Sequence, residues 1–141
     1  MKNKITVWLS LAIIMSATIT ACSALPVSQL AVEAQAAPAY QMISVDELDD
    51  RMREDDLFLV NVHIPLEGNI PGTDQTIPYN AVEDYLDSLP ADKDQPIYLY
   101  CRSDSMGHTA ARTLLDLGYT RVYNLEGGYI AWRAAGLPFV E

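Results

Sequence analysis

The feature that most constrains the fold is an alternation of short apolar runs with amphipathic helical patterns over residues 40–141. Residues 97–100 carry no charge, residues 57–62 have Asn61 as their single polar position, and residues 122–125 form another strand-like run. Strands separated by helices of this length imply right-handed crossovers. The pattern therefore predicts an α/β fold with a mostly parallel sheet, in a single domain of ordinary size.

The predicted helices have clear start and stop signals. Ser44 and Glu47 have the spacing of a capping box, in which the serine caps the helix and the glutamate reaches back. Asn80 is placed to cap a second helix. The apolar stripe of that helix consists of Val82, Tyr85, Leu86 and Leu89. A third helix is predicted to begin near Gly107 and to end at Gly118.

The remaining segments are shorter. Residues 64–74 hold two prolines and two glycines, which predicts a loop. Residues 76–79 form a weak strand that Pro78 assigns to an edge or a strand end. Gly127 and Gly128 turn the chain into a final helix, for which Trp132 is expected to pack in the core or as a lid, rather than to bind a ligand. The other apolar positions of that helix are Ile130, Ala131 and Ala134.

The N-terminal segment is typical of an export signal. Lys2 and Lys4 precede an apolar stretch over residues 5–19, which is short for a membrane span. The stretch ends in Ile-Thr-Ala-Cys at residues 19–22, which resembles the lipobox of bacterial lipoproteins. We expect a signal peptide at 1–21, a lipidated Cys22 and a flexible tether over 22–39, which place the protein on the extracytoplasmic side of a bacterial membrane. The alternative is an ordinary secretory signal.

The charge of the chain restricts its partners. Without residues 1–21, seven Lys and Arg remain against 19 Asp and Glu, a formal charge of −12. This balance argues against nucleic acid as a partner. An anionic surface is also repelled by anionic lipid, so membrane contact is expected through the acyl anchor alone.

The chain has two cysteines, Cys22 and Cys101. If Cys22 carries lipid, Cys101 has no partner for an intramolecular disulfide, and a lone thiol in an exported protein points to reactivity. The two histidines, His63 and His108, are far apart in the sequence and give no metal-ligand spacing. We therefore expect neither a metal nor a cofactor. His108 either tunes Cys101 or faces solvent.

Cys101 stands at the junction of a buried strand and a helix, where sheets of this kind bind ligands. A tight loop over residues 102–106 and the start of the following helix can direct backbone N–H groups at one point, which stabilises an anion. The same arrangement favours a thiolate and makes Cys101 a nucleophile. The alternative is an inert buried cysteine. The polar residues at 102–105 argue against it, because they are costly to bury unpaired.

The chain resembles a known family at these residues. Tyr100-Cys101-Arg102-Ser103, Leu114 to Tyr119, and Val122 to Gly128 followed by Ala131-Trp132 look like the C-terminal half of a single rhodanese domain. Residues 59–62 and 68–72 resemble the N-terminal half more loosely, so the likeness covers residues 40–139. The resemblance implies a central parallel five-stranded sheet flanked by helices.

The resemblance also implies a sulfurtransferase. In that family the cysteine takes a sulfane sulfur from a donor, becomes a persulfide, and passes the sulfur to a thiol or protein acceptor. Cys101 is then the catalytic residue. The expected substrate-binding residues are Arg102, Ser103, Asp104, Ser105, Met106 and Gly107.

Several positions depart from the family pattern. Met106 stands where thiosulfate-using members commonly have a basic residue, and the Asp104 carboxylate would repel a dianion. A persulfide or polysulfide donor is therefore favoured over thiosulfate. The usual Asp-Val-Arg is Asn61-Val62-His63 here, and the loop histidine is Asn69, so we expect a changed polar network at the rim.

Two other functions compete. A non-catalytic rhodanese-like binding module on the membrane surface would explain Met106 and Asp104. A cysteine-dependent phosphatase or arsenate reductase shares the loop before the helix, but its Cys-x5-Arg signature requires arginine where this chain has Gly107.

Overall fold

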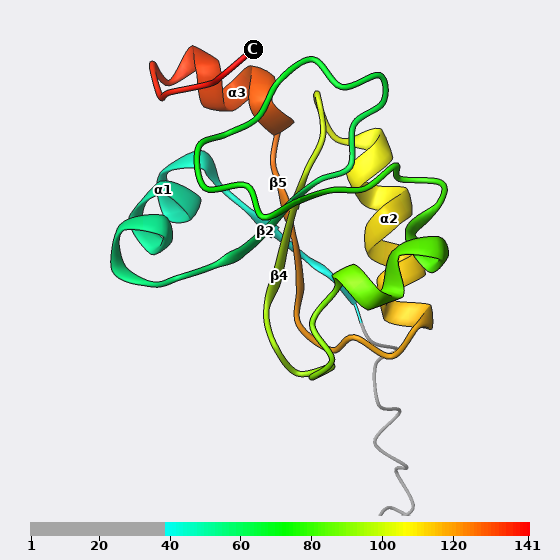
Figure 1. Ribbon diagram of the computed structural model, residues 1–141. Coiled ribbons are helices and arrows are strands. Elements are labelled where there is room, and N and C mark those ends of the chain that lie inside the picture. Colours follow the sequence, from blue (N-terminus) through cyan, green and yellow to red (C-terminus); the bar gives the residue numbers. More distant parts are fainter. Residues whose placement is uncertain (1–38) are drawn as a thin grey trace, which may run out of the picture. The chain divides into compact units, whose positions relative to one another are not determined.

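The computed structural model describes residues 39–141, which form a five-stranded sheet with helices on both faces (Figure 1). The predicted signal peptide, the lipid-bearing Cys22 and the tether up to residue 38 lie outside the described residues. No helix in the described part of the chain is long and apolar enough to cross a membrane.

The sheet is parallel throughout and has the strand order β1-β5-β4-β2-β3. The strands are β1 (Gln41–Ile43), β2 (Phe58–Asn61), β3 (Gln75–Thr76), β4 (Ile97–Tyr100) and β5 (Val122–Leu125). β4 is central, with Leu99 paired to Val60 on one side and to Asn124 on the other. The expectation of a buried parallel sheet is confirmed, and the uncharged run at 97–100 occupies its middle.

The two edge strands differ from the prediction. β1 has no counterpart in it, because three residues of which Gln41 and Met42 are exposed carry little hydrophobic signal. β3 covers Gln75–Thr76 rather than 76–79. Backbone bonding to the chain of β2 continues beyond this strand, because the amides of Ile77 and Tyr79 donate to the carbonyls of Asn61 and Val62. Pro78, which has no N–H to donate, lies between these two donors.

The first helix, α1 (Val45–Glu54), begins as predicted, with Ser44 Oγ accepting from the amide of Glu47 at 3.2 Å. The Glu47 carboxylate does not reach back. It pairs instead with Arg51 one turn later, at 2.6 Å.

The prediction of a second α-helix capped by Asn80 is wrong. The segment is a 3₁₀ helix, η2 (Val82–Ser88), which follows Ala81 without a side-chain cap and is interrupted at Tyr85, where φ is −115°. The interruption breaks the 3.6-residue period, so the stripe cannot face one direction. Val82 and Leu89 are buried, whereas Tyr85 and Leu86 are exposed.

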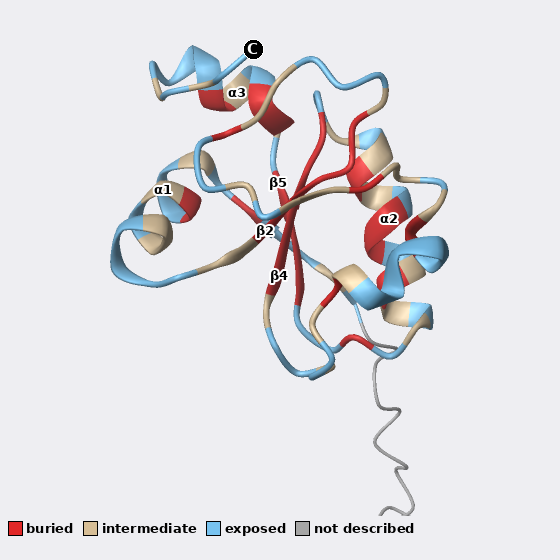
Figure 2. Ribbon diagram, in the orientation of Figure 1, coloured by how far each residue is buried: buried red, intermediate tan, exposed pale blue. Residues whose placement is uncertain are grey.

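Alternate residues along the strands enter two separate cores. The buried residues lie in the strands and on the helices beside them (Figure 2). Leu99 and Cys101 pack with α2 (Ser105–Asp116) and η2 on one face of the sheet. Tyr98 and Tyr100 pack with α1 and α3 (Gly128–Ala134) on the other face. The side chain of Cys101 therefore belongs to the α2 face.

The buried residues of the last helix are not the three apolar positions that the sequence indicated, Ile130, Ala131 and Ala134. Ile130 is 47% exposed, whereas Tyr129 and Trp132 are buried in the α1–α3 core. Trp132 packs as predicted, and its indole N–H donates to the carbonyl of Pro138 at 2.8 Å.

Candidate functional site

Cys101 directly follows β4 at the carboxyl end of the central strand. It is a free thiol with a residue exposure of 2%. A ligand must therefore approach it through the loop that follows, and this loop governs what the thiol can contact.

The loop is shorter than predicted, because α2 begins at Ser105 rather than near Gly107. Asp104 is the N-cap residue, but its side chain makes no capping bond to the helix. Within residues 39–141, no group accepts a hydrogen bond from the N–H groups of residues 102–107. Unpaired amides at the start of a twelve-residue helix favour negative charge.

The turn between β5 and α3 fixes the loop from the other side. The Cys101 carbonyl accepts from the amide of Tyr129 at 2.9 Å, and the Arg102 carbonyl accepts from the amide of Ile130 at 3.2 Å. Gly128, at φ +57°, lies so close that a Cβ there would be 2.6 Å from the carbonyl carbon of Arg102. Gly128 and the next two residues of α3 thus act as a backbone clamp on the cysteine loop.

Asp104 also belongs to this clamp. Its Oδ1 accepts from the amide of Gly127 at 2.9 Å. One carboxylate oxygen is thereby committed to holding the β5–α3 turn, a contact that sequence spacing does not reveal.

The other predicted loop residues are spread over different surroundings. Ser103 and Ser105 are exposed. Gly107 is buried against the side chain of Asn124 in β5, so it packs the helix onto the sheet. Met106 is half-buried, and with Tyr79, Ser105 and Thr109 it lines a cavity of about 200 Å³ beside the loop.

A group of charged and aromatic side chains lies next to the loop, formed by His63, Glu67, Arg102 and Tyr129. Arg102 Nε is 4.0 Å from a Glu67 oxygen, and the Tyr129 hydroxyl donates to the same carboxylate. The His63 ring lies edge-on to Tyr129, with 5.7 Å between centroids, and its Nδ1 is 3.3 Å from Met106 Sδ. Sequence reasoning missed Glu67 and Tyr129 because they are distant from Cys101 along the chain.

This group has shifted acid–base properties. The hydrogen bond from Tyr129, aided by the charge of Arg102, holds the pKa of Glu67 below its usual value. Burial, together with the hydrogen bond to Glu67, raises the pKa of Tyr129 to about 12. At neutral pH the group therefore contains an ionised carboxylate and a neutral phenol.

A polar network at the same edge takes the place of the altered family motifs. The Asn61 amide donates to the carbonyl of Gly68 and to Asn69 Oδ1, both at 2.9 Å. Tyr100 donates to Asn69 Oδ1 at 3.1 Å and accepts from the amide of Ile70. Asn61 Oδ1 also accepts from the amide of His63. The polar network at the rim is therefore changed as expected, and these hydrogen bonds join neutral groups.

His108 neither contacts the thiol region directly nor lies free in solvent. It is half-buried in α2, and its Nδ1 is 3.0 Å from the hydroxyl of Tyr40. In the described residues no cluster of three or more metal-binding side chains is present.

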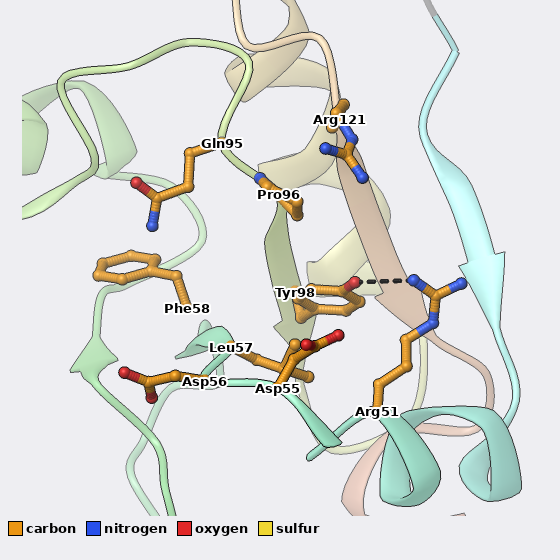
Figure 3. A pocket seen from close by; sticks show the side chains of 9 residues that line it. All are labelled: Arg51, Asp55, Asp56, Leu57, Phe58, Gln95, Pro96, Tyr98 and Arg121. Carbon is orange, nitrogen blue, oxygen red and sulfur yellow. Dashed lines mark hydrogen bonds between the residues drawn. The ribbon is translucent and has the colours of Figure 1, made fainter. Parts of the chain in front are cut away.

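A cavity of about 260 Å³ lies at the opposite, amino end of the strands (Figure 3). Its lining includes Arg51, which donates to the Tyr98 hydroxyl at 3.1 Å, and Arg121. This lining contains no thiol, whereas Cys101 lies at the opposite, carboxyl end of the strands.

Comparison with known proteins finds one family over most of the described domain. Residues 44–135 match the family model of the Rhodanese-like domain. The chain is 36% identical over 102 residues to a protein named Sulfurtransferase from Allochromatium vinosum, covering 70% of this chain and 92% of that protein. It is 27% identical over 106 residues to Thiosulfate sulfurtransferase GlpE of Pseudoalteromonas translucida, covering 73% of this chain and 98% of that protein.

A solved structure gives the same result. The human single-domain sulfurtransferase TSTD1 is similar with a TM-score of 0.59 and 25% sequence identity, covering 66% of this chain and 95% of that chain. The shared region is the described domain rather than one isolated motif.

Proposed function

The chain belongs to the rhodanese-like domain family, as the motifs around Cys101 predict, and we propose that it is a sulfurtransferase that carries sulfur as a persulfide on Cys101. The named relatives support sulfur transfer as the reaction class. The observation that carries the proposal is the position of Cys101, a free thiol followed by six backbone amides, in the loop and the first turn of α2, that make no hydrogen bond within residues 39–141. Those amides stabilise a thiolate or persulfide anion.

The reaction has two half-reactions. The Cys101 thiolate attacks the outer sulfur of a donor, a bond forms between Sγ and that sulfur, and the donor fragment leaves with the electron pair of the broken S–S bond. An acceptor nucleophile then attacks the outer sulfur of the persulfide and releases Cys101 as a thiolate.

Persulfides and polysulfides are the proposed donors, in preference to thiosulfate. Arg102 lies near Glu67, and the loop also contains the ionisable Asp104, so a dianion finds little net positive charge there. The half-buried Met106 offers an apolar, polarisable wall to a sulfur chain.

A donor panel tests the proposal in the Cys22→Ser chain, where Cys101 is the single cysteine. Glutathione persulfide and polysulfide are expected to add the mass of one sulfur atom, measured by intact mass spectrometry, and to do so faster than thiosulfate. The Cys101→Ser variant is expected to gain nothing. If no donor loads the protein, the binding-module function stands in its place.

We further propose that Cys22 carries a lipid and that the domain faces the extracytoplasmic side of a bacterial membrane, on the support of residues 1–22. The native chain is then expected to sediment with membranes, and the Cys22→Ser chain to appear in the soluble envelope fraction. Equal distribution of the two chains would contradict the anchor.

A further inference from the structure

We infer that His63 is the acid–base residue of this site, protonating the thiol that leaves a persulfide donor and deprotonating the thiol that accepts the sulfur. The inference rests on the proposed function and deepens it, because it specifies thiol-based donors and acceptors.

The strand register places His63 beside the reactive loop. Asn61 of β2 is paired with Tyr100 of β4, and the amide of Val62 donates to the Tyr100 carbonyl at 2.9 Å. The next residue, His63, therefore lies at the carboxyl edge alongside Cys101 and Arg102. Its ring contacts Met106 in the first turn of α2, and it also contacts Tyr129, whose amide holds the Cys101 carbonyl.

The imidazole has an unused nitrogen. His63 Nε2 is buried without a hydrogen-bond partner among the described residues, and its side chain is 7% exposed. Glu67 Oε1 is 3.6 Å from this nitrogen, which is too long for a hydrogen bond but within ion-pair distance when the imidazole is protonated. Asn124 Oδ1 is also unpartnered, but it faces Gly107 inside the packed helix–sheet contact. A buried polar atom without a partner at the edge of a reactive loop indicates a ligand.

The surroundings suit a proton that moves in both directions. The charged and titratable groups facing His63 are Glu67 from its own loop, Arg102 from the cysteine loop and Tyr129 from α3, whereas α2 contributes the uncharged Met106. Glu67 supports the imidazolium, and Arg102 opposes it. Imidazole is the side chain that changes charge between about pH 5 and 8.

The proton balance closes over one cycle. The Cys101 thiolate attacks the outer sulfur of R–S–SH and forms a bond to it. The bond between the two sulfur atoms of the donor breaks, and its electron pair remains on RS⁻. The His63 imidazolium gives this thiolate a proton, and RSH leaves. Neutral His63 then takes a proton from the acceptor R′SH, R′S⁻ attacks the outer sulfur, and Cys101 departs as a thiolate. The product is R′S–SH, with no net oxidation or reduction.

The chemistry of the leaving group makes the inference testable. A thiol has a pKa of about 8.5, so an alkyl thiolate is a basic leaving group that benefits from protonation. The thiolate of an electron-poor aromatic thiol is weakly basic and leaves without help. Loss of an acid therefore slows alkyl donors selectively.

The test measures single-turnover loading of Cys101 in the Cys22→Ser chain with an alkyl persulfide and with the persulfide of an electron-poor aromatic thiol. His63→Gln is expected to slow loading from the alkyl donor about 100-fold and to leave the aromatic donor nearly unchanged. His108→Gln, which changes the other histidine, is expected to match the parent.

Equal slowing with both donors, or slowing with neither, would overturn the role of His63 while leaving sulfur transfer intact. Failure of the parent chain to load from either donor would overturn the proposed function itself. Thermal melts show whether His63→Gln is folded. If it is not, His63→Asn replaces it and is held to the same comparison of the two donors, with the same outcomes supporting or overturning the inference.

Discussion

The two ends of the sheet each hold a cavity and an arginine, but they receive opposite ends of the helices. At the carboxyl end, α1, α2 and α3 begin, and Cys101 is followed by unpaired amides. At the amino end, α1 and α2 finish, and the cavity there is lined by Arg51 from the last turn of α1 and by Arg121 (Figure 3).

This difference separates the chemistry of the domain from its stabilisation. Helix N-termini, which gather at the carboxyl end, favour anions, whereas helix C-termini favour cations. Arg51 at the amino end is already committed to the Glu47 carboxylate and the Tyr98 hydroxyl. Arg102 thus lies beside the proposed reactive loop at one end, whereas Arg51 contributes to packing at the other.

The largest predicted effect comes from comparing one glycine at each end. Gly128 and Gly118 both have positive φ, at +57° and +90°, but Gly128 faces the backbone of Cys101 and Arg102, whereas a Cβ on Gly118 meets nothing within 4 Å. Gly118→Ala is expected to lower the free energy of unfolding by about 1–2 kcal/mol through φ strain alone. Gly128→Ala is expected to lose about 1–3 kcal/mol more through overpacking.

Chemical denaturation measures both costs, and mass spectrometry measures the rate at which Cys101 is loaded. Gly128→Ala is expected to slow loading, because the clamp on the loop is displaced, and Gly118→Ala is expected to leave it unchanged. Equal losses of stability and rate in the two variants would show that the clamp has no special part in the site.

A smaller effect is expected from Arg51→Ala at the amino end. The variant loses the hydrogen bond to Tyr98 and the cation–π contact with Tyr123, where the guanidinium carbon is 5.6 Å from the ring centroid. The expected loss is about 1 kcal/mol in free energy of unfolding, with unchanged sulfur loading. Arg53→Ala is the control, because the ion pairs of Arg53 are exposed and are worth less than about 0.5 kcal/mol. Altered loading in Arg51→Ala would mean that the two ends are coupled.

The smallest predicted effect is on stability at alkaline pH, and it comes from Tyr129 at the carboxyl end of the sheet. The pKa of Tyr129 is raised from 10.0 to about 12, chiefly by burial and then by its bond to Glu67. Folding favours the protonated phenol, so this contribution to stability is complete below pH 10 and is lost as the pH rises through about 12. The difference in absorbance at 295 nm between the parent and Tyr129→Phe is expected to report tyrosinate forming near pH 12. Glu67→Gln should lower this midpoint only in part, because the burial of Tyr129 remains. A midpoint near pH 10 in the parent would contradict the burial of Tyr129 and its bond to Glu67.

Much of the fold could be predicted because its signals are local. The uncharged run at 97–100 is central, Ser44 caps α1, and Gly118 ends α2. These features depend on burial, on one hydrogen bond and on one dihedral angle. The strand β1 and the 3₁₀ helix η2 were not predicted, since the first is stabilised by pairing with β5 and the second by how Val82 and Leu89 meet the core.

The candidate site divides in the same way. Cys101 and its loop could be predicted because strand, loop and helix are consecutive in the chain. Glu67 and Tyr129 are separated by 62 residues and meet only after the loop following β2 and the helix following β5 reach the same edge. Asp104 likewise acquires its contact with Gly127 from the fold rather than from its neighbours.

The sequence by itself determined a parallel α/β domain with a lone thiol where a buried strand gives way to a helix, because hydrophobic period, caps and turns act over a few residues. Tertiary structure decided which groups surround that thiol: the Gly128 clamp, the engaged carboxylate of Asp104, and His63 with an unpaired nitrogen. The reason is that strand order β1-β5-β4-β2-β3 brings the chain after β2 and the chain after β5 to the two sides of β4. Adjacency in a sheet arises from burial across the whole domain, and no single segment encodes it.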